Sequence, residues 1–423
     1  MIRHLYSCLF YLGLPLALLK LWKRSRKAPA YAQRIGERFA HIPQRDDQPL
    51  WIHAVSVGET VAIAPLIEQL LERQPDIPLL VTTTTPTGSE RVKTLFGDRV
   101  SHCYCPYDLP HLLHRFLKRV KPRGLVIVET ELWPNMLAAC AKRKIPVLLA
   151  NARLSERSAR GYQKVSALTR PMMQQLSCVA AQDNEGGQRF VELGLSPEKL
   201  QVTGSIKFDH QPPADAVTNG LELRKQWGEH RPVLIAGSTR EGGEDGMLLE
   251  VFGQLKQPYS ELLLILVPRH LERFDSATQQ AEAAGWNTSR RSLNNATAQT
   301  DVFVGDSMGE MATYYAAADL CFVGGSLVET GGQNPLEPAM LGKPVFMGPH
   351  LFNFSDIAKQ LEQAGGLTVV SNIDELTKVL KQRLENPEQA RQQGATAHAF
   401  VEKNQGALER LYQLTENVFR LEN

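Results

Sequence analysis

Several features that would assign a protein to a common functional class are missing from this sequence of 423 residues. Its net charge of +2 indicates no global attraction to nucleic acid. None of its six cysteines forms a Cys-x-x-Cys pair, so no paired metal-binding or redox cysteines are indicated. The chain also lacks the Gly-x-Gly-x-x-Gly dinucleotide fingerprint and the Gly-x-x-x-x-Gly-Lys-Ser/Thr phosphate loop.

The remaining candidate metal ligands are few. Cys103 and Cys105 alternate within a strand-like run, which is more typical of buried thiols than of a metal site. His111 and His114 have helical spacing, and a solvated helix face explains them better than a zinc site. We therefore expect no tightly bound metal.

Charge is also absent near the N-terminus, where no residue between His4 and Lys20 is charged. The basic residues that follow are Lys20, Lys23, Arg24, Arg26 and Lys27. Fifteen helical residues reach about 22 Å, which is short for a hydrocarbon core of about 30 Å. A secretory signal would carry its charge before the apolar stretch, and a buried helix is a further alternative. We predict a membrane-anchor helix over 1–22, either spanning the bilayer or lying in its interface, with the bulk of the chain in the cytosol.

From residue 50 onward, short apolar runs alternate with helical patterns. Runs such as WIHAV, GLVIVET and PVLLANA occur in the first half, and PVLIAGST, LLLILVPR and DLCFVGGS in the second. This alternation predicts parallel sheets with both faces covered by helices. The polar, Pro-containing stretch 207–220 separates two such sets, so we predict two doubly wound α/β domains. After the anchor at 1–22, the predicted boundaries are 23–206 and 207–395 for the two domains and 396–423 for a C-terminal helix.

The stretch WIHAVSVGET (51–60) contains an acidic residue with two possible roles. Ser56 and Glu59 stand at the start of a helical pattern with the Ser-x-x-Glu spacing of a capping box. Glu59 also follows a strand end, which is where ligands of doubly wound sheets bind. From the residues alone, Glu59 is either a helix cap or a carboxylate that performs chemistry.

The run CFVGGSLVETGGQNPLEPAMLG in the second half indicates a nucleotide site. Asn334 is a favoured N-cap, Pro335 suits the first helical position and Glu337 falls at the third. Two Gly-Gly pairs (324–325 and 331–332) allow a ligand to approach the backbone closely. A helix N-terminus can face a phosphate, and Glu337 can accept hydrogen bonds from ribose hydroxyls. The alternative is an ordinary well-started helix.

Two further strand ends in this half carry similar chemistry. One is followed by Met308, Gly309 and Glu310, and another by Pro268 and Arg269. Arginine can bind a phosphate through its planar guanidinium. Each of these residue groups, taken alone, is typical of an ordinary loop. Their occurrence together at adjacent strand ends favours a nucleotide site.

In the first half, Glu129 and Glu131 follow one predicted strand, and Arg153, Arg157 and Arg160 follow the next. The run TTTTPTGSER supplies hydroxyls at one more strand end. These residues form either a cradle for an anionic acceptor or a solvated charged face. With two such domains, we expect the site in the cleft between them.

The motifs together resemble those of one enzyme family. AVSVGE, TPTGSERV, ETELWPN, NARLS, VPRHLERF, GGSLVETGGQNPLEP and GPHLFNF are similar, in content and order, to the 3-deoxy-D-manno-octulosonic acid (Kdo) transferases of Gram-negative lipopolysaccharide assembly. The resemblance covers essentially the whole chain. It implies a GT-B glycosyltransferase fold, with two Rossmann-like domains facing a central cleft and the donor CMP-Kdo held by the C-terminal domain.

The resemblance also implies the chemistry. The acceptor is the lipid A precursor (lipid IVA) at the cytoplasmic side of the inner membrane, and CMP is released with inversion and without a bound metal or other cofactor. The catalytic base falls on Glu59. The implied CMP contacts are Pro268, Arg269, Met308, Gly309, Glu310, Asn334, Pro335, Leu336 and Glu337. The number of Kdo units added varies within the family and does not carry over.

Combined with the resemblance, the residue patterns favour Glu59 as a general base, and a capping role can coexist with it. Three other functions are compatible with parts of this pattern. A transferase using a UDP-sugar is the nearest enzyme alternative, and a membrane-tethered scaffold that kept the fold is the non-catalytic one. An NAD-dependent oxidoreductase would have the same kind of doubly wound α/β domain. It would also need the Gly-x-Gly-x-x-Gly fingerprint, which this sequence lacks.

Overall fold

The computed structural model of this chain describes residues 2–421 and divides into two compact units. Unit 1 comprises the residues up to His210 together with those from Gln405 onward, and unit 2 comprises Gln211–Asn404. The division after His210 falls inside the polar stretch 207–220.

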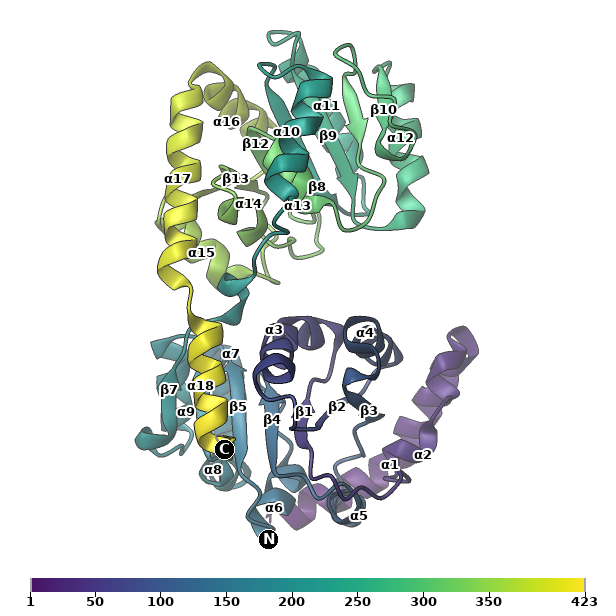
Figure 1. Ribbon diagram of the computed structural model, residues 1–423, viewed down its shortest axis with the longest axis vertical. Coiled ribbons are helices and arrows are strands. Elements are labelled where there is room, and N and C mark those ends of the chain that lie inside the picture. Colours follow the sequence, from purple (N-terminus) through teal and green to yellow (C-terminus); the bar gives the residue numbers. More distant parts are fainter. Residues whose placement is uncertain (1, 422–423) are drawn as a thin grey trace. The chain divides into compact units, whose positions relative to one another are not determined.

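Unit 1 is built on a parallel seven-stranded sheet with the order β3-β2-β1-β4-β5-β6-β7 (Figure 1). Its strands are β1 (Leu50–His53), β2 (Leu79–Thr83), β3 (Ser101–Tyr104), β4 (Gly124–Val128), β5 (Val147–Ala152), β6 (Cys178–Ala181) and β7 (Leu200–Val202). The strand order reverses between β1 and β4, and ligands of such sheets bind at the carboxyl ends of the strands at this point. The residues that follow β1 and β4 therefore occupy the favoured position for a site.

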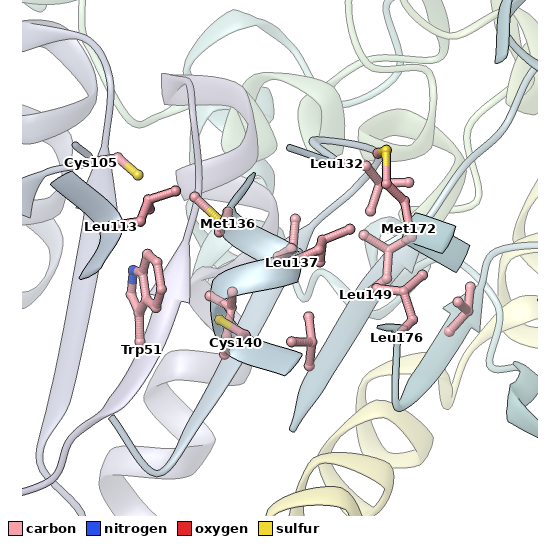
Figure 2. Close-up of a cluster of buried hydrophobic side chains, with 14 of the residues drawn as sticks. Trp51, Cys105, Leu113, Leu132, Met136, Leu137, Cys140, Leu149, Met172 and Leu176 are labelled. Carbon is pink, nitrogen blue, oxygen red and sulfur yellow. The ribbon is translucent and has the colours of Figure 1, made fainter. Parts of the chain in front are cut away.

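Helices cover both faces of this sheet. The helices of unit 1 are α1 (Ile2–Lys27), α2 (Ile35–Arg38), α3 (Val57–Arg73), α4 (Pro86–Phe96), α5 (Pro110–Val120), α6 (Pro134–Lys142), α7 (Glu156–Lys164), α8 (Ser166–Gln175), α9 (Asn184–Glu192) and α18 (Ala407–Phe419). Side chains from α5, α6, α8 and α9 form one core, which includes Trp51, Met136, Leu149 and Met172 (Figure 2). Helices α3, α4 and α18 form the core on the other face.

The C-terminal segment differs from the single helix predicted over 396–423. The structure has two helices there, α17 (Pro387–Asn404) in unit 2 and α18 in unit 1, separated at Gly406, whose φ of 87° favours glycine. The Asp209 carboxylate accepts hydrogen bonds from the N–H groups of Gly406 and Leu408 at 2.5 and 2.7 Å and so caps α18. Residues 422–423 lie outside the described part of the chain.

Helix α18 is integral to the core of unit 1. A Cβ atom placed on Gly124, at the start of β4, would lie only 2.1 Å from the ring of Phe419 in α18. The missing side chain at Gly124 is what allows this close approach.

Unit 2 repeats the architecture with a parallel seven-stranded sheet in the order β10-β11-β9-β8-β12-β13-β14. Its strands are β8 (Val233–Thr239), β9 (Leu263–Pro268), β10 (Thr288–Arg290), β11 (Val302–Val304), β12 (Leu320–Val323), β13 (Val345–Met347) and β14 (Leu367–Val369). Its other helices are α10 (Ala216–Trp227), α11 (Glu244–Lys256), α12 (Phe274–Ala283), α13 (Met311–Ala317), α14 (Leu336–Met340), α15 (Ser355–Gln363) and α16 (Ile373–Glu385). Here the strand order reverses between β8 and β12.

The helix predicted at the N-terminus is present as α1, although Met1, the first residue of the predicted anchor, lies outside the described residues. Its length and composition suffice to cross a membrane, and only 6% of its most apolar window is buried in the protein. Cys8 on this helix is exposed, whereas the other five cysteines are buried. The expectation of buried thiols at Cys103 and Cys105 is confirmed.

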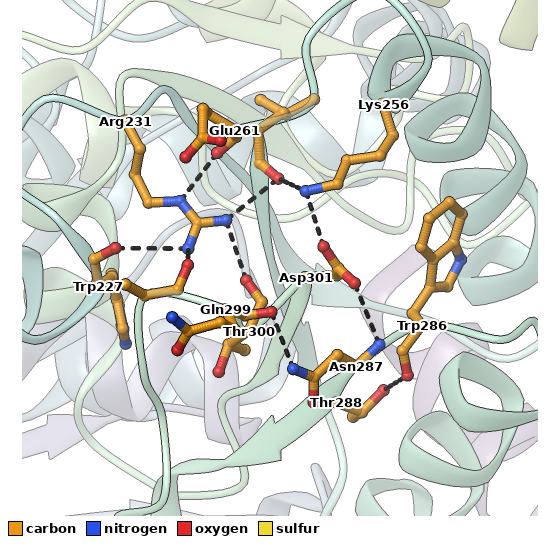
Figure 3. Close-up of polar contacts among 12 residues, drawn as sticks. Trp227, Arg231, Lys256, Glu261, Trp286, Asn287, Thr288, Gln299, Thr300 and Asp301 are labelled. Carbon is orange, nitrogen blue, oxygen red and sulfur yellow. Dashed lines mark hydrogen bonds and ion pairs between the residues drawn. The ribbon is translucent and has the colours of Figure 1, made fainter.

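A buried arginine holds together the amino-terminal edge of the unit 2 sheet (Figure 3). Arg231 is 7% exposed, and its guanidinium donates hydrogen bonds to carbonyl oxygens from three segments. The acceptors are the backbone oxygens of Trp227, Glu261, Leu262, Ala298 and Thr300, at 2.8 to 3.4 Å. Beside it, Lys256 forms an ion pair with Asp301 at 2.7 Å.

Replacing Arg231 with methionine is expected to lower the free energy of unfolding by about 2–4 kcal/mol, because it leaves several buried carbonyl groups without donors. Urea unfolding followed by tryptophan fluorescence measures this change. Arg391→Met is the matched control, since Arg391 is exposed and forms an ion pair with the exposed Glu388, and it should change the free energy by less than about 0.5 kcal/mol. An equal effect of the two variants would contradict a structural role for Arg231.

Candidate active site

Glu59 lies in the first turn of α3 and makes the hydrogen bonds of a helix cap. Ser56 is the N-cap residue, and its hydroxyl accepts a hydrogen bond from the Glu59 N–H at 3.3 Å. In return the Glu59 carboxylate accepts from the Val55 N–H at 2.7 Å and from the Ser56 hydroxyl at 2.9 Å. A standard capping box binds the N-cap amide, whereas this carboxylate binds the amide one residue earlier. The capping interpretation of Glu59 is confirmed in this shifted form.

The same carboxylate has a pKa suited to proton transfer. Glu59 is 8% exposed, and its burial raises its pKa from 4.5 to about 7. The hydrogen bonds from Val55 and Ser56 lower the pKa, and the charges of Glu131 and Glu129 raise it. Burial therefore outweighs the helix N-terminus, which stabilises an anion by only about 0.3–1 kcal/mol. Near pH 7 a large fraction of Glu59 is ionised, which is the state that a general base needs.

Glu129 and Glu131 follow β4, the strand beside β1, and their charges act on Glu59 from there. The backbone of Glu129 has a φ of 59°, in the left-handed region that non-glycine residues rarely adopt. Such strain costs of order 1–3 kcal/mol and concentrates at functional sites. The Glu131 carboxylate accepts a hydrogen bond from the Trp133 indole at 3.2 Å. The structure thus brings three carboxylates to the strand-order reversal of unit 1.

His53, at the end of β1, is a residue that the sequence prediction missed. Its Nδ1 lies 2.9 Å from the Thr82 hydroxyl, which also accepts a hydrogen bond from the Trp51 indole at 2.8 Å. Burial lowers the His53 pKa to about 4, and Nε2 is buried without a partner among residues 2–421. The only signal in the sequence was a histidine inside the apolar run WIHAV.

The arginines predicted to bind an anionic acceptor follow β5. Arg153 is half-buried, and its carbonyl oxygen accepts a hydrogen bond from the Thr130 hydroxyl, which joins the loops after β4 and β5. Arg157 is exposed on α7. Arg160 forms an ion pair with Glu156 one turn earlier, at 2.5 Å. The structure therefore places Arg153 next to the loop that carries Glu129, and leaves Arg157 at the surface.

In unit 2, Pro268 ends β9 and Arg269 follows it in an exposed position. The Arg269 N–H donates to the carbonyl oxygen of Thr239, at the end of the neighbouring strand β8, at 3.0 Å. Burial raises the pKa of the Glu337 carboxylate, and the positive charge of Arg269 partly opposes this rise. Arg269 and Glu337 therefore lie close enough to interact.

Helix α14 begins at Leu336, one residue later than predicted, and has only five residues. Asn334 binds its first turn, because its side-chain oxygen accepts from the Leu336 N–H at 3.1 Å. The Asn334 amide nitrogen also donates to Glu337 at 3.4 Å. Pro335 stands at the N-cap position. These hydrogen bonds fix the orientation of the Glu337 carboxylate.

The loop after β11 holds the third predicted group. Met308 is 57% exposed, and Gly309 has a φ of 88° that favours glycine. Glu310 is bound by Arg291 at 2.7 Å and accepts from the Ser307 hydroxyl at 2.5 Å. The hydrogen bond from Arg291 holds the pKa of Glu310 below its usual value. Because β11, β9, β8 and β12 are neighbours in the sheet, this loop shares an edge with Arg269.

A second missed residue, Glu244, occupies the anion position that the first Gly-Gly pair provides. Its carboxylate accepts hydrogen bonds from the N–H groups of Gly325, Ser326 and Leu327 at 2.7, 3.1 and 3.1 Å. A fourth comes from the Arg240 N–H at 2.8 Å, and Glu244 is fully buried. These amides are therefore taken by an internal carboxylate and are not free for a ligand phosphate. The sequence feature that could have indicated Glu244 is the acidic pair after two glycines in the run STREGGEDG.

Comparison with known proteins assigns this geometry to a family. Residues 33–210 match a family model described as 3-deoxy-D-manno-octulosonic-acid transferase (kdotransferase), and residues 246–400 match glycosyl transferases group 1. The chain is 42% identical to a 3-deoxy-D-manno-octulosonic acid transferase of Haemophilus influenzae, over 97% of each chain. It is 37% identical to one of Bordetella pertussis, over 95% of this chain and 96% of that protein.

The chain belongs to the Kdo transferase family. It is a glycosyltransferase that transfers Kdo in lipopolysaccharide synthesis, as its motifs predicted. Among solved structures, Acinetobacter baumannii MurG is 16% identical with a TM-score of 0.55, covering 87% of this chain and 99% of that chain. A UDP-GlcNAc 2-epimerase of Neisseria meningitidis is 14% identical with a TM-score of 0.54, covering 84% and 98%. These likenesses confirm the predicted GT-B fold of this Kdo transferase.

In this Kdo transferase the two matched regions correspond to the two units, one match lying in unit 1 and the other in unit 2. Each unit carries its predicted residues at the carboxyl edge of its sheet. Unit 1 supplies a buried carboxylate with a pKa near neutrality, and unit 2 supplies a cation, Arg269, and a carboxylate, Glu337, that is hydrogen-bonded to Asn334. Proton transfer fits the first set, and binding of a nucleotide phosphate and ribose fits the second.

Proposed function

We propose that this Kdo transferase moves Kdo from CMP-Kdo to a lipid A precursor (lipid IVA), with inversion at the anomeric carbon and with Glu59 as the general base. The observation that carries the proposal is the buried Glu59 carboxylate, whose pKa is raised to about 7. A base with a pKa near the working pH combines a large ionised fraction with a strong drive to accept a proton.

The proposed step balances as follows. The Glu59 carboxylate takes the proton of an acceptor hydroxyl, and the hydroxyl oxygen forms a bond to the anomeric carbon of Kdo. The bond between that carbon and the phosphate oxygen breaks at the same time, and CMP leaves with the electron pair. Attack from the face opposite the leaving group inverts the anomeric centre.

Unit 2 is proposed to bind the donor. Arg269 is exposed at the end of β9, where its guanidinium can pair with the phosphate of CMP and stabilise the departing charge. Glu337, oriented by Asn334, can accept hydrogen bonds from the ribose hydroxyls. The remaining proposed contacts are Pro268, Met308, Gly309, Glu310, Pro335 and Leu336. This scheme needs no resident metal, so activity should survive treatment with a chelator.

Unit 1 is proposed to bind the acceptor. Arg153 and Arg157 supply positive charge after β5 for a phosphorylated sugar, and Glu129 and Glu131 can accept hydrogen bonds from its hydroxyls. The acceptor is a lipid, so the enzyme must work at a membrane. Helix α1 is the element proposed to hold it at the cytoplasmic side of the inner membrane.

The activity can be tested directly with the purified full-length protein. It is incubated with CMP-Kdo, made in situ, and the tetra-acylated lipid A precursor, and the lipid product is analysed by mass spectrometry. The expected result is a product heavier by whole Kdo units, whose number the same spectrum reports. An unchanged lipid, with CMP-Kdo intact and the protein folded, would contradict the proposal.

Replacing Arg269 with alanine is expected to weaken CMP binding about 10- to 100-fold, because a charged hydrogen bond to phosphate is worth about 1.5–3 kcal/mol. Isothermal titration calorimetry with CMP measures this effect, and Arg269→Lys should retain part of the affinity. Arg391→Ala, on the exposed face of α17 in the same unit, is the matched control. Unchanged CMP affinity in Arg269→Ala would remove this residue from the proposed donor site.

A further inference from the structure

The first three turns of α1 are bound to the body of unit 1 by buried polar groups. Asn135, at the start of α6, is 1% exposed and donates to the Ser7 hydroxyl at 3.0 Å. Its side-chain oxygen accepts from the Arg3 guanidinium at 3.3 Å. The Tyr6 hydroxyl is hydrogen-bonded to the Asp108 carboxylate, which also accepts from the Asn135 N–H at 3.1 Å. These contacts join α1 to α6 and to the loop before α5 through Asn135 and Asp108, which are both buried.

Aromatic contacts extend this attachment along the helix. The Tyr11 hydroxyl lies 2.5 Å from His111 Nδ1, and the two rings are stacked with centroids 5.6 Å apart. The Phe10 ring packs against Tyr107 at 6.4 Å. Figure 1 shows the first part of α1 beside α6 and α5, and α1 contacts both α6 and α8.

Beyond the other end of α1, the chain returns to the body of the same unit. The chain passes from α1 through the short helix η1 (Pro29–Ala32) into α2. Arg34, just before α2, donates to the Ser89 hydroxyl and to the His102 carbonyl oxygen, both at 3.0 Å. Unit 1 thus holds the first three turns of a helix about 39 Å long, at 1.5 Å per residue, and the chain meets the body of unit 1 again at Arg34, after the helix has ended. A bilayer-spanning helix would need its first turns on the far side of the hydrocarbon core, away from Asn135 and Asp108.

The side of α1 opposite this attachment is apolar and exposed. Five of its eight leucines recur at intervals of four and three residues and form one stripe along the helix, whereas Leu14, Leu18 and Leu21 lie on the other side and are half-buried. The stripe consists of Leu5, Leu9, Leu12, Leu16 and Leu19, which are 47–76% exposed. At its C-terminal end the same helix carries exposed positive charge and an exposed tryptophan. These residues are Lys20, Trp22, Lys23, Arg24 and Arg26.

We propose that α1 lies flat on an anionic phospholipid surface, with the leucine stripe in the boundary between head groups and acyl chains, and does not cross the bilayer. The lipid is the occupant that the charges favour, because lysine and arginine beside an apolar stripe attract anionic head groups. Trp22 fits the interfacial level, where tryptophan side chains concentrate. This inference rests on the membrane association in the proposed function and specifies the orientation of the helix.

Cys8 supplies the probe, since it is the single exposed cysteine of the six. A nitroxide is attached to Cys8, and the full-length protein is added to the outside of vesicles of phosphatidylglycerol and phosphatidylethanolamine. The flat orientation predicts a shallow label that a membrane-impermeant nickel chelate, added outside, relaxes strongly. A label at the bilayer centre, or one relaxed only by chelate trapped inside the vesicles, would overturn the proposal.

Vesicle pelleting separates this inference from the proposed function. Leu12→Glu combined with Leu16→Glu should reduce partitioning by about 100-fold or more, because each change removes a leucine from the apolar boundary. Leu221→Glu is the matched control, since Leu221 is 58% exposed on α10 of unit 2, and it should pellet like the unaltered protein. Failure of the unaltered protein to bind vesicles would refute membrane association itself, whereas binding with a deep Cys8 label refutes only the flat orientation. Efficient Cys8–Cys8 cross-linking in lipid-free solution would assign the stripe to a second copy of the chain.

Discussion

Replacing Glu59 with glutamine is expected to lower kcat by about 10²- to 10⁴-fold while leaving the affinity for CMP unchanged. The range is the contribution typical of a positioned general base. Glutamine has nearly the same shape and can still accept from the Val55 N–H and donate to the Ser56 hydroxyl, so the first turn of α3 should persist. The measurements are initial rates of Kdo transfer and calorimetry with CMP.

The pH dependence should distinguish a base from a mere cap. With the pKa of Glu59 raised to about 7, the rate of the unaltered enzyme should fall as the pH drops below 7 and level off above it. The residual rate of Glu59→Gln should lack this dependence. Glu68→Gln is the matched control, because Glu68 lies on the same helix but is paired with Arg99 at the surface. Loss of activity in Glu68→Gln, or normal activity in Glu59→Gln, would contradict the assignment.

As the pH rises, the stability of the folded protein should fall while the rate of transfer rises. The pKa of Glu59 is higher in the folded protein than its ordinary value of 4.5, so the folded state binds the proton more tightly. The folded protein is therefore relatively less stable as pH rises from about 4.5 through 7. The deficit reaches about 3 kcal/mol at pH 8, at about 1.4 kcal/mol per pKa unit. Glu59→Gln should consequently unfold at a higher temperature than the unaltered protein at pH 8, with the difference vanishing near pH 4.5.

Replacing Glu244 with alanine is expected to destabilise unit 2 by about 4 kcal/mol or more and to abolish tight CMP binding. The change leaves four backbone N–H groups without an acceptor, and each unsatisfied buried group costs about 1–3 kcal/mol. The loop over Gly325–Leu327 should then lose its conformation. Thermal unfolding monitored by fluorescence, together with CMP calorimetry, measures both effects.

Two related variants sharpen this test of the loop. Glu244→Gln keeps one oxygen acceptor, so its loss of stability should be smaller than that of Glu244→Ala. Glu241→Gln is the matched control, since Glu241 is exposed and forms an ion pair with the neighbouring Arg240, and it should behave like the unaltered protein. Normal stability and normal CMP binding in Glu244→Ala would show that the loop does not depend on this carboxylate.

The interior strands were predictable because their sequences are almost uninterrupted apolar runs. β4 (Gly124–Val128) and β9 (Leu263–Pro268) are buried along their whole length, as the runs GLVIVET and LLLILVPR indicated. The edge strand β10 (Thr288–Arg290) was missed because it is three residues long and polar, which is typical of a strand with one unpaired side. β3 (Ser101–Tyr104), at the other sheet edge, was signalled only as a strand-like run around its cysteine.

The candidate site was predictable residue by residue but not in its interactions. Glu59 stands out in the sequence through its position after an apolar run, yet its pKa depends on burial and on Glu129 and Glu131, more than 65 residues away. The Gly324-Gly325 pair indicated a turn that binds an anion, but the anion is Glu244 from a separate loop. Such pairings depend on which strands become neighbours, and local patterns do not specify that.

The sequence alone determined that two parallel α/β sheets form, that acidic and basic residues gather at their carboxyl edges, and that one apolar helix stands at the N-terminus. These features could be predicted because apolar periodicity, capping residues and glycines determine structure within a few residues of their own positions. Only the tertiary structure decided that Glu59 is buried and has a pKa near neutrality, that the Glu244 carboxylate binds the glycine loop, and that the first turns of α1 are attached to unit 1. Those outcomes arise from contacts between residues distant in the chain, and burial sets their energies.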